Sequence, residues 1–447
     1  MVALTIDTFA RRLRAGDTSS QQAVDDCLRR IDADNPRLNA FIQVLAADAR
    51  RHAVEADREL ASGIDRGPLH GVPVSVKDVF DIAGTVTSAA SRVREGLVAS
   101  HDAVAVKRLR RAGAVIVGKT NLHEFAFGTT NEDSAFGPAR NPLDDTRSPG
   151  GSSGGSAASV VAGMALATLG TDTGGSIRIP SAACGLVGLK PGYDELSADG
   201  VVPLSRTLDH VGPLTATVTD AWHMLHALRD HHAPAKPLSV ASVHQLKLGM
   251  LAQYFCELLD DDVRRAFGAA IRALREQGAT VVDVDIPHAS VIAPIYLHIV
   301  LGDAAAYHAD TLDTMPDRYT PNVRLRLEMA RYVMAEDYVR ALDGRRVLRH
   351  EVDAALSSVD ALVLPTLPIV APPIGASTVQ IGEQQQPVRN LMLRLTQLFN
   401  LTGHPAITMP CGTSASGLSC GLQLVGLSGQ TDRLMDIAAG IEHVLSR

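Results

Sequence analysis

The first sixty residues carry a helical pattern of apolar and polar positions. Apolar residues recur there at four-residue spacing: Ala23, Cys27 and Ile31. Ser19-Ser20 can cap a helix just before them, and Asn35-Pro36 is expected to end it. A second run, rich in alanine and charged residues, predicts a helix over residues 38–60, which Ser62-Gly63 closes. We therefore expect residues 1–63 to form a helical layer at the N-terminus.

The pattern then changes to the two-residue alternation of strands. In the segment Gly71–Lys77, valines alternate with other residues, which predicts a strand. A helix-like stretch over 103–112 and an apolar run over 114–117 follow it. The second half of the chain repeats this order, with predicted helices at 261–277, 322–357 and after 425, and predicted strands at 280–284, 361–364, 405–409 and 421–425. Strand, helix and strand with short connections indicate an α/β fold with parallel pairing.

The chain shows little sign of a division into separate domains. Its 447 residues would suggest about three domains at ~150 residues each, but large α/β folds often exceed that size. There is no short-period repeat, long block of like charges or disordered linker. The weakest seam is Asp230–Val240, which is short. We expect one large domain over residues 1–447.

Composition and charge exclude several classes of protein. Hydrophobic residues make up 46% of the chain and charged residues 20%, which predicts a globular protein with a sizeable core. The net charge of −7 creates no general attraction to nucleic acid or to anionic lipid, so neither is expected as a partner. The uncharged stretch Ser148–Thr171 is rich in Gly, Ser and Ala, which predicts tightly packed backbone and not a membrane span. Five scattered cysteines without a CxxC pair, and an N-terminus without a signal-peptide pattern, favour the cytoplasm.

Two glycine-rich turns carry the candidate chemistry. They span Ser148–Ser156 and Gly170–Arg178, and a run of small residues separates them. Glycines allow backbone N–H groups to approach a ligand closely, as in a phosphate site or an oxyanion hole. A P-loop would need Lys-Ser/Thr after the last glycine, but Gly175 is followed by Ser176-Ile177, and no GxGxxG follows a predicted strand. Acyl transfer fits better, because serine is itself a nucleophile.

The base for such a serine is not obvious from the pattern alone. A literal GxSxG occurs at Gly151–Gly155, but Pro149 and paired glycines precede it where a nucleophile elbow needs a strand. A serine–histidine triad would have to recruit a residue such as His210, which nothing singles out. Lys77, at the end of a predicted apolar strand, would have a lowered pKa if buried, although most lysines at strand ends reach solvent. No HExxH or paired histidine spacing indicates a metal site.

The sequence resembles the amidase signature family of serine hydrolases. The motifs that carry the resemblance span nearly the whole chain: the Gly-Gly-Ser-Ser-Gly-Gly block at Gly150–Gly155, Asp-x-Gly-Gly-Ser-x-Arg at Asp172–Arg178, Gly-Leu-Lys-Pro at Gly188–Pro191, the lysine strand at Gly71–Asp78, Gly118–Asn121, Pro365–Pro368 and the segment from Gly421. The resemblance implies an α/β fold with a large mixed, mostly parallel β-sheet covered by helices on both faces. It implies no cofactor and no metal.

The resemblance also implies roles for individual residues. The family's Ser–cis-Ser–Lys triad falls on Ser176 as nucleophile, Ser152 as relay in a cis peptide and Lys77 as base. The backbone N–H groups of the loop that contains the nucleophile would form the oxyanion hole: Thr173, Gly174, Gly175 and Ser176. Ser153 and Arg178 would support this arrangement by hydrogen bonds. Substrate contacts are expected in the variable regions, with Phe125 and Ala126 as candidates, and 4% aromatic residues suggest an aliphatic lining.

The substrate is the least determined part of the prediction. Family members hydrolyse amides, carbamates (urethanes) and urea-like compounds, so a stand-alone amidase with a small-molecule substrate is the first hypothesis. A homodimer is compatible with it. The alternative is the glutaminase-type A subunit of a tRNA-dependent amidotransferase, which works with partner subunits. That branch carries an acidic residue shortly before its Asn-Leu-x-Gly segment, where this chain has Leu393 and Arg394. A catalytically inactive binding protein is disfavoured because all three triad residues are present.

Overall fold

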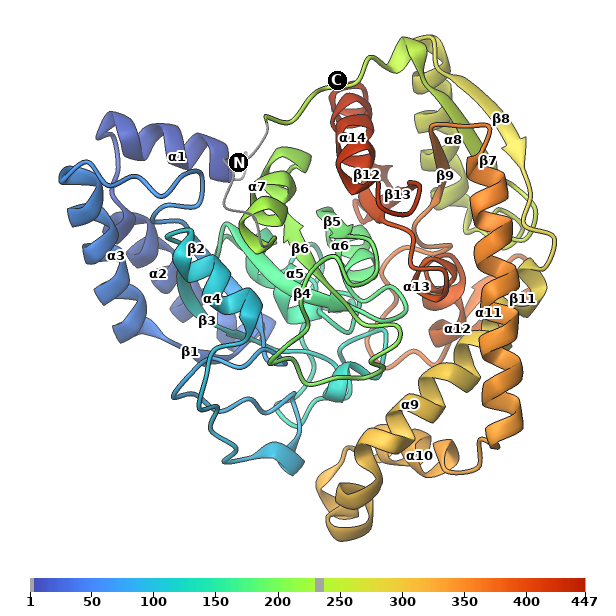
Figure 1. Ribbon diagram of the computed structural model, residues 1–447, viewed down its shortest axis with the longest axis horizontal. Coiled ribbons are helices and arrows are strands. Elements are labelled where there is room, and N and C mark those ends of the chain that lie inside the picture. Colours follow the sequence, from blue (N-terminus) through green and yellow to red (C-terminus); the bar gives the residue numbers. More distant parts are fainter. Residues whose placement is uncertain (1–3, 230–236, 447) are drawn as a thin grey trace.

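A mixed β-sheet runs through the whole molecule in the computed structural model, which describes residues 4–229 and 237–446 (Figure 1). The strand order is β1-β3-β2-β4-β6-β5-β12-β13-β9-β7-β8. The strands are β1 (Phe41–Val44), β2 (Pro73–Lys77), β3 (Val115–Thr120), β4 (Ala167–Asp172), β5 (Val187–Lys190), β6 (His210–Thr215), β7 (Lys247–Leu251), β8 (Thr280–Val284), β9 (Ala361–Pro365), β12 (Ala406–Thr413) and β13 (Ser419–Val425). A small hairpin, β10 (Thr378–Ile381) with β11 (Gln384–Pro387), stands apart. Most of the predicted seam, residues 230–236, lies outside the described residues.

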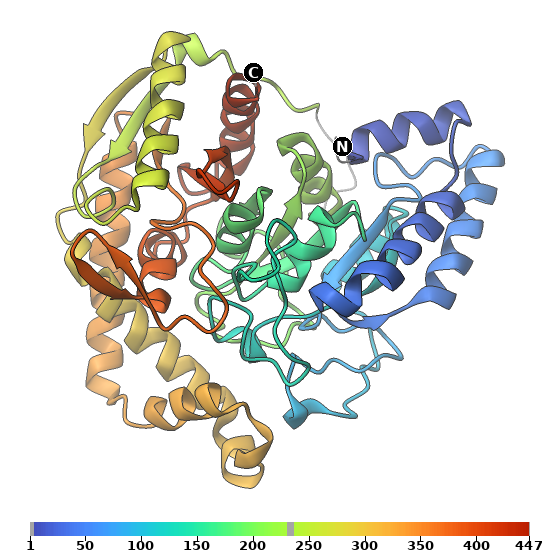
Figure 2. The same cartoon turned by 180° about the vertical axis from the view of Figure 1, so that it is seen from behind.

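Helices cover both faces of this sheet, as expected. In Figure 1, α4 and α7 lie in front of the sheet. In Figure 2, which shows the opposite side of the molecule, α2 covers the other face. The helices are α1 (Ile6–Ala15), α2 (Ser20–Leu38), α3 (Ala46–Ala61), α4 (Val104–Arg111), α5 (Gly154–Val161), α6 (Arg178–Cys184), α7 (Val218–Leu228), α8 (Asp261–Glu276), α9 (Ile292–Thr314), α10 (Pro321–Ala330), α11 (Ala335–Leu356), α12 (Val388–Arg394), α13 (Gln397–Leu401) and α14 (Thr431–Leu445). The α/β class and the large mixed sheet are confirmed.

Parallel pairing occupies two separate parts of the sheet. β2 pairs parallel with β3 and β4, and β7 pairs parallel with β8 and β9. The five pairings between these parts are antiparallel, as is that of β1 with β3 at the edge, so that six of the ten pairings within the described sheet are antiparallel. The parallel share is therefore smaller than the sequence predicted. The reason is local: β12 and β13 are joined by a short turn, and a short connection can only make an antiparallel pair.

The N-terminal layer differs from the prediction at one point. α2 follows the predicted cap at Ser19, but it continues through Pro36 and ends at Leu38, where it is capped by Asn39 with a left-handed φ of 49°. The expected second helix over 38–60 is wrong at its start, because residues 41–44 form β1, which pairs with β3 at the edge of the sheet. The helix α3 occupies the remainder of that run.

The predicted long helix over 322–357 is interrupted. It divides into α10 and α11, which pack along α9 and extend to one side of the molecule (Figure 1). The segment 289–314, which contains α9, is long and apolar enough by length and composition to cross a membrane, the one such stretch among the described residues. In this structure α9 packs against α10, α11 and α13.

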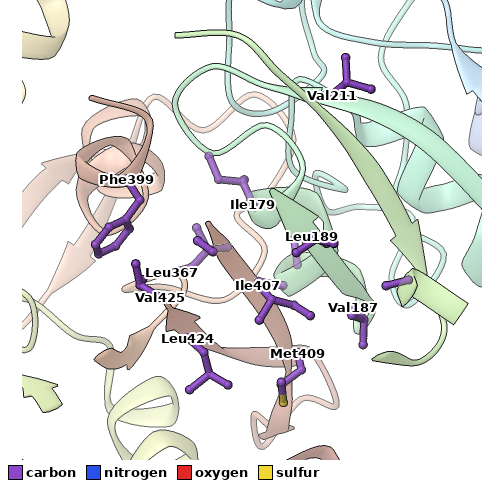
Figure 3. Close-up of a cluster of buried hydrophobic side chains, with 14 of the residues drawn as sticks. Ile179, Val187, Leu189, Val211, Leu367, Phe399, Ile407, Met409, Leu424 and Val425 are labelled. Carbon is purple, nitrogen blue, oxygen red and sulfur yellow. The ribbon is translucent and has the colours of Figure 1, made fainter. Parts of the chain in front are cut away.

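The hydrophobic core continues directly beneath the glycine-rich turns. Figure 3 shows buried side chains on both faces of β12 and β13: Ile179 of α6 and Phe399 of α13 lie on one side, and Ile407 and Leu424 point to the other. Each of these four is fully buried. Because α6 begins two residues after Ser176, this packing fixes the position of the second turn.

Candidate active site

Lys77 and Ser152 lie in direct contact in the interior. Lys77 is the last residue of β2, a strand that is buried at every position, and its side chain is fully buried. Its Nζ lies 2.8 Å from Ser152 Oγ and 2.7 Å from Thr171 Oγ1 on the neighbouring strand β4. The peptide bond between Gly151 and Ser152 is cis. The sheet therefore holds an amine, a relay-type hydroxyl and a second hydroxyl in one buried cluster.

Burial lowers the pKa of Lys77 to about 7, against the opposing negative charges of Asp209 and Asp172. At neutral pH a large fraction of this amine is therefore uncharged and can accept a proton. Asp209 escaped the sequence analysis, because no motif singles it out. Its carboxylate accepts a hydrogen bond of 2.6 Å from Thr173 Oγ1, and burial raises its own pKa to about 6.

The first glycine-rich turn is built for close approach of backbone. A Cβ at Gly151 would lie 2.8 Å from the backbone nitrogens of Thr130 and Asn131. A Cβ at Gly155 would lie 2.5 Å from two carbonyl oxygens, so neither position can hold a side chain. Ser153, fully buried, directs its Oγ to the carbonyl of Thr171 at 3.3 Å. The turn is thus held against β4, where Lys77 is also bound.

The second glycine-rich turn carries Ser176 between β4 and α6. Gly175 has a φ of 137°, which favours glycine, and a Cβ at Gly174 would clash with the Tyr296 hydroxyl. Among the described residues, no acceptor is found for the backbone N–H groups of the four predicted oxyanion-hole positions: Thr173, Gly174, Gly175 and Ser176. Ser176 is 6% exposed, and its hydroxyl has no hydrogen-bond partner within the described chain, Ser152 included. The loop thus presents free donors and a free hydroxyl together.

A buried ion pair anchors this turn at both ends. Arg178 Nη2 lies 2.9 Å from Asp172 Oδ1, and its Nε lies 3.0 Å from the other carboxylate oxygen. The guanidinium also donates to Gln423 Oε1 at 2.6 Å, to the carbonyl of Thr396 at 3.0 Å and to Asn400 Oδ1 at 2.7 Å. Burial alone would raise the pKa of Asp172, but the charge and hydrogen bonds of Arg178, together with Lys190 and Asn400, outweigh it and hold that pKa well below its usual range. Arg178 therefore holds the turn and does not face its free donors.

The histidine alternative receives no support from geometry. The ring Nδ1 of His210 lies 2.7 Å from the carbonyl oxygen of Leu208, and burial places the pKa of His210 well below its ordinary value. No group of three or more His, Cys, Asp or Glu residues in the described parts of the chain could hold a metal ion.

The two predicted substrate contacts are buried in a strained turn. Phe125 and Ala126 have φ values of 52° and 58°, and both are nearly inaccessible. The Phe125 ring packs edge-on against His308 at 4.4 Å and near Tyr319 at 5.5 Å. Neither residue lines the pocket beside Gly174, so a direct substrate contact remains a prediction for them.

A pocket of about 460 Å³ lies on the side chains of Tyr296 and Leu393, and no residue of the Ser176 loop itself lines it. Tyr296 and Leu393 form its link to the loop, since both lie against Gly174. Its other side chains include aromatic, amide and guanidinium groups: Tyr254, Arg389, Asn390, Arg394 and Gln397. The lining of this pocket is mixed, because α9 brings mainly apolar side chains and α12, distant in sequence, brings polar ones, so an aliphatic substrate site stays a prediction. Sequence patterns could not reveal this meeting of two helices.

Comparisons with known proteins agree on one family. A family profile described as Amidase matches residues 22–435. The A subunit of glutamyl-tRNA(Gln) amidotransferase from Roseiflexus sp. (strain RS-1) is 37% identical over 476 residues, which cover 99% of this chain and 96% of that protein. A crystal structure described as amidase superposes with a TM-score of 0.92 at 36% identity and covers 98% of this chain and 99% of its own. A structure from a complex that bears on the origins of an s-triazine catabolic enzyme matches with a TM-score of 0.92, 32% identity and 98% coverage of both chains.

Proposed function

We propose that this chain, which belongs to the amidase family, hydrolyses the C–N bond of small-molecule amides through an acyl-enzyme on Ser176. The observation that carries the proposal is the 2.8 Å contact between Lys77 Nζ and Ser152 Oγ, made by a buried amine whose pKa is about 7. A serine nucleophile needs a base, and this pair supplies one beside the Ser176 loop.

The reaction proceeds as two acyl transfers. Neutral Lys77 accepts the proton of Ser152, which in turn takes the proton of Ser176 as the Ser176 oxygen attacks the carbonyl carbon. The C=O electron pair moves onto oxygen, and the free N–H groups from Thr173 to Ser176 bind that oxyanion. The C–N bond then breaks, and the nitrogen leaves with the proton returned by Lys77 through Ser152. Water repeats the sequence in the second half, releasing the acid and free Ser176.

The proposal extends to neighbouring substrate chemistry. Carbamates (urethanes) and urea-like compounds present the same carbonyl bonded to nitrogen, so they are included as substrates. We propose a stand-alone cytoplasmic enzyme. In it, the buried residues Phe125 and Ala126 support the side chains that line the substrate site.

A second candidate is the glutaminase-type component of a tRNA-dependent amidotransferase, because relatives such as the Roseiflexus protein carry that name. One structural observation weighs against it. Glutamine is a zwitterion, and binding it needs a carboxylate for its ammonium group. Leu393 lies beside Gly174, in the stretch where that branch of the family carries an acid, and the pocket lining contains no Asp or Glu.

A substrate panel separates these candidates. Purified wild type would be assayed with anilides, short aliphatic amides, aryl carbamates and glutamine, with the Ser176→Ala variant as control. We expect amide or carbamate hydrolysis by the chain alone, and labelling of Ser176 by a fluorophosphonate. Ammonia released only from glutamine, and only after partner proteins are added, would establish the second candidate. Turnover that survives Ser176→Ala would refute the proposed mechanism.

A further inference from the structure

The pocket beside the Ser176 loop contains a guanidinium without a counter-ion. Arg389, in the first turn of α12, lines this pocket with Tyr296 and Leu393. Its Nε is buried and has no hydrogen-bond partner, and the described residues supply neither an ion pair nor a hydrogen bond to the rest of its guanidinium. Arg389 is half-buried and stays charged at neutral pH, and leaving its buried Nε donor unpaired costs free energy. The protein alone therefore does not satisfy Arg389.

The charges around Arg389 leave an excess of one cation. The positive charge of Arg389 acts on Arg326, whose pKa is lowered by burial and lowered further by that charge. Asp133 lies 3.9 Å from Arg326 and 3.1 Å from His123. Burial lowers the pKa of His123 in spite of Asp133, which keeps the ring neutral near pH 7. Arg326 thus has a carboxylate partner, whereas Arg389 has none among the described residues.

The Nε of Arg394, the other arginine of the pocket, is also buried without a hydrogen-bond partner, but the rest of its guanidinium is bound by the protein. Its guanidinium stacks on the Tyr254 ring at 3.7 Å, donates to the carbonyl of Tyr254 at 2.7 Å and lies 3.7 Å from Glu257. Its charge is therefore already compensated by the protein. Arg389 is the guanidinium in the pocket that is free to bind something else.

We propose that Arg389 binds a carboxylate of the substrate, so that the enzyme acts on amides that carry one negative charge and no ammonium group. This inference rests on the proposed amidase function and specifies its substrate class. A single carboxylate matches the charge excess and the fork of donors on a guanidinium. The lining has no carboxylate to pair with an ammonium group, which separates such substrates from amino-acid amides. Tyr296 and Leu393 line the pocket and also lie against Gly174, so we expect them to set the distance between the carboxylate and the scissile amide.

Matched substrate pairs test the inference. The ω-amides of malonate, succinate, glutarate and adipate would be compared with the corresponding diamides, in which a neutral amide replaces the carboxylate at nearly constant shape. We expect wild type to favour one chain length of the charged series over its diamide by at least tenfold in kcat/KM. In Arg389→Gln that ratio should fall ten- to hundredfold, and Arg389→Lys should restore part of it. Arg394→Gln, the matched control, should leave the ratio within threefold of wild type.

The outcomes separate the carboxylate contact of Arg389 from the proposed amidase function. If wild type hydrolyses the diamides as well as or better than every charged partner, the carboxylate inference is overturned while the amidase function stands, and this result needs no variant. An equal fall of the ratio of kcat/KM values in Arg394→Gln and Arg389→Gln would also overturn the inference. That result would mean that the overall positive charge of the pocket attracts the carboxylate, without a specific contact to Arg389. If the chain hydrolyses neither series nor any carbamate, the proposed function itself fails.

Discussion

The state of charge of Lys77 should control the rate across neutral pH. With a pKa of about 7, the amine is about one-tenth neutral at pH 6, one-half at pH 7 and nine-tenths at pH 8. If neutral Lys77 is the base, kcat/KM rises about tenfold from pH 6 to pH 8 and then levels. The assay is a pH–rate profile with a neutral amide, whose own charge does not change over this range.

Replacement of the amine should remove both the rate and this pH dependence. Lys77→Met keeps the length and apolar stem of the side chain but cannot accept a proton, so we expect kcat to fall by about 10²–10⁴. The rise between pH 6 and pH 8 should disappear from the residual activity. A wild-type profile that is flat below pH 9, or a variant with more than a tenth of the wild-type rate, would show that another group is the base.

The pH dependence of the unfolding free energy tests the lowered pKa of Lys77 independently of activity. The folded state loses the Lys77 proton near pH 7, whereas the unfolded lysine holds it to about 10.5. Between these values the unfolded state binds more protons, so this residue contributes stability that rises with pH. Lys77→Met abolishes the contribution. The difference in unfolding free energy between Lys77→Met and wild type should therefore be highest near pH 7 and decline toward pH 10. The pKa shift of Lys77 limits this decline to about a few kcal/mol.

The two glycine-rich turns support three more predictions. Ser176→Ala should abolish labelling and reduce turnover by at least about 10³-fold, with an unchanged thermal transition, since its hydroxyl bonds nothing in the described chain. Arg178→Met should destabilise the fold by about 3–5 kcal/mol in urea unfolding, because it strands the buried charge of Asp172; a loss below about 1 kcal/mol would contradict the anchoring role. Gly174→Ala should cost at least about tenfold in kcat, as its Cβ would clash with Tyr296 and move the N–H donors, and an unchanged kcat would show that the loop tolerates that movement.

Local patterns predicted most of the strands and the longer helices. The strand β8 begins and ends where the alternation indicated, and α8 differs from its predicted bounds by one residue. The missed strand β1 consists of Phe-Ile-Gln-Val, which favours a strand, but it is only four residues long and the alanine-rich run that follows it dominated the helical prediction. The break between α10 and α11 carries neither Gly nor Pro in residues 331–334 and is set by packing against α9.

The candidate site divides in the same way. Its chemical groups stand in contiguous motifs, which is why Lys77, Ser152 and Ser176 could be proposed from the sequence. The environment that tunes them is assembled from distant segments. Asp209, which affects the pKa of Lys77, and Arg389, which lines the pocket, belong to no motif and meet the site only through the folding of other elements. Single-sequence patterns do not contain that information.

The bonds of Arg178 to the last quarter of the chain bear on when the protein becomes competent during synthesis. Thr396, Asn400 and Gln423 satisfy the guanidinium that braces the Ser176 loop, and all three leave the ribosome after the segments that hold Lys77, Ser152 and Ser176. The loop therefore gains these hydrogen bonds only after the last quarter of the chain has been made. Under the proposed mechanism, a nascent chain would become able to hydrolyse amides only at that late stage.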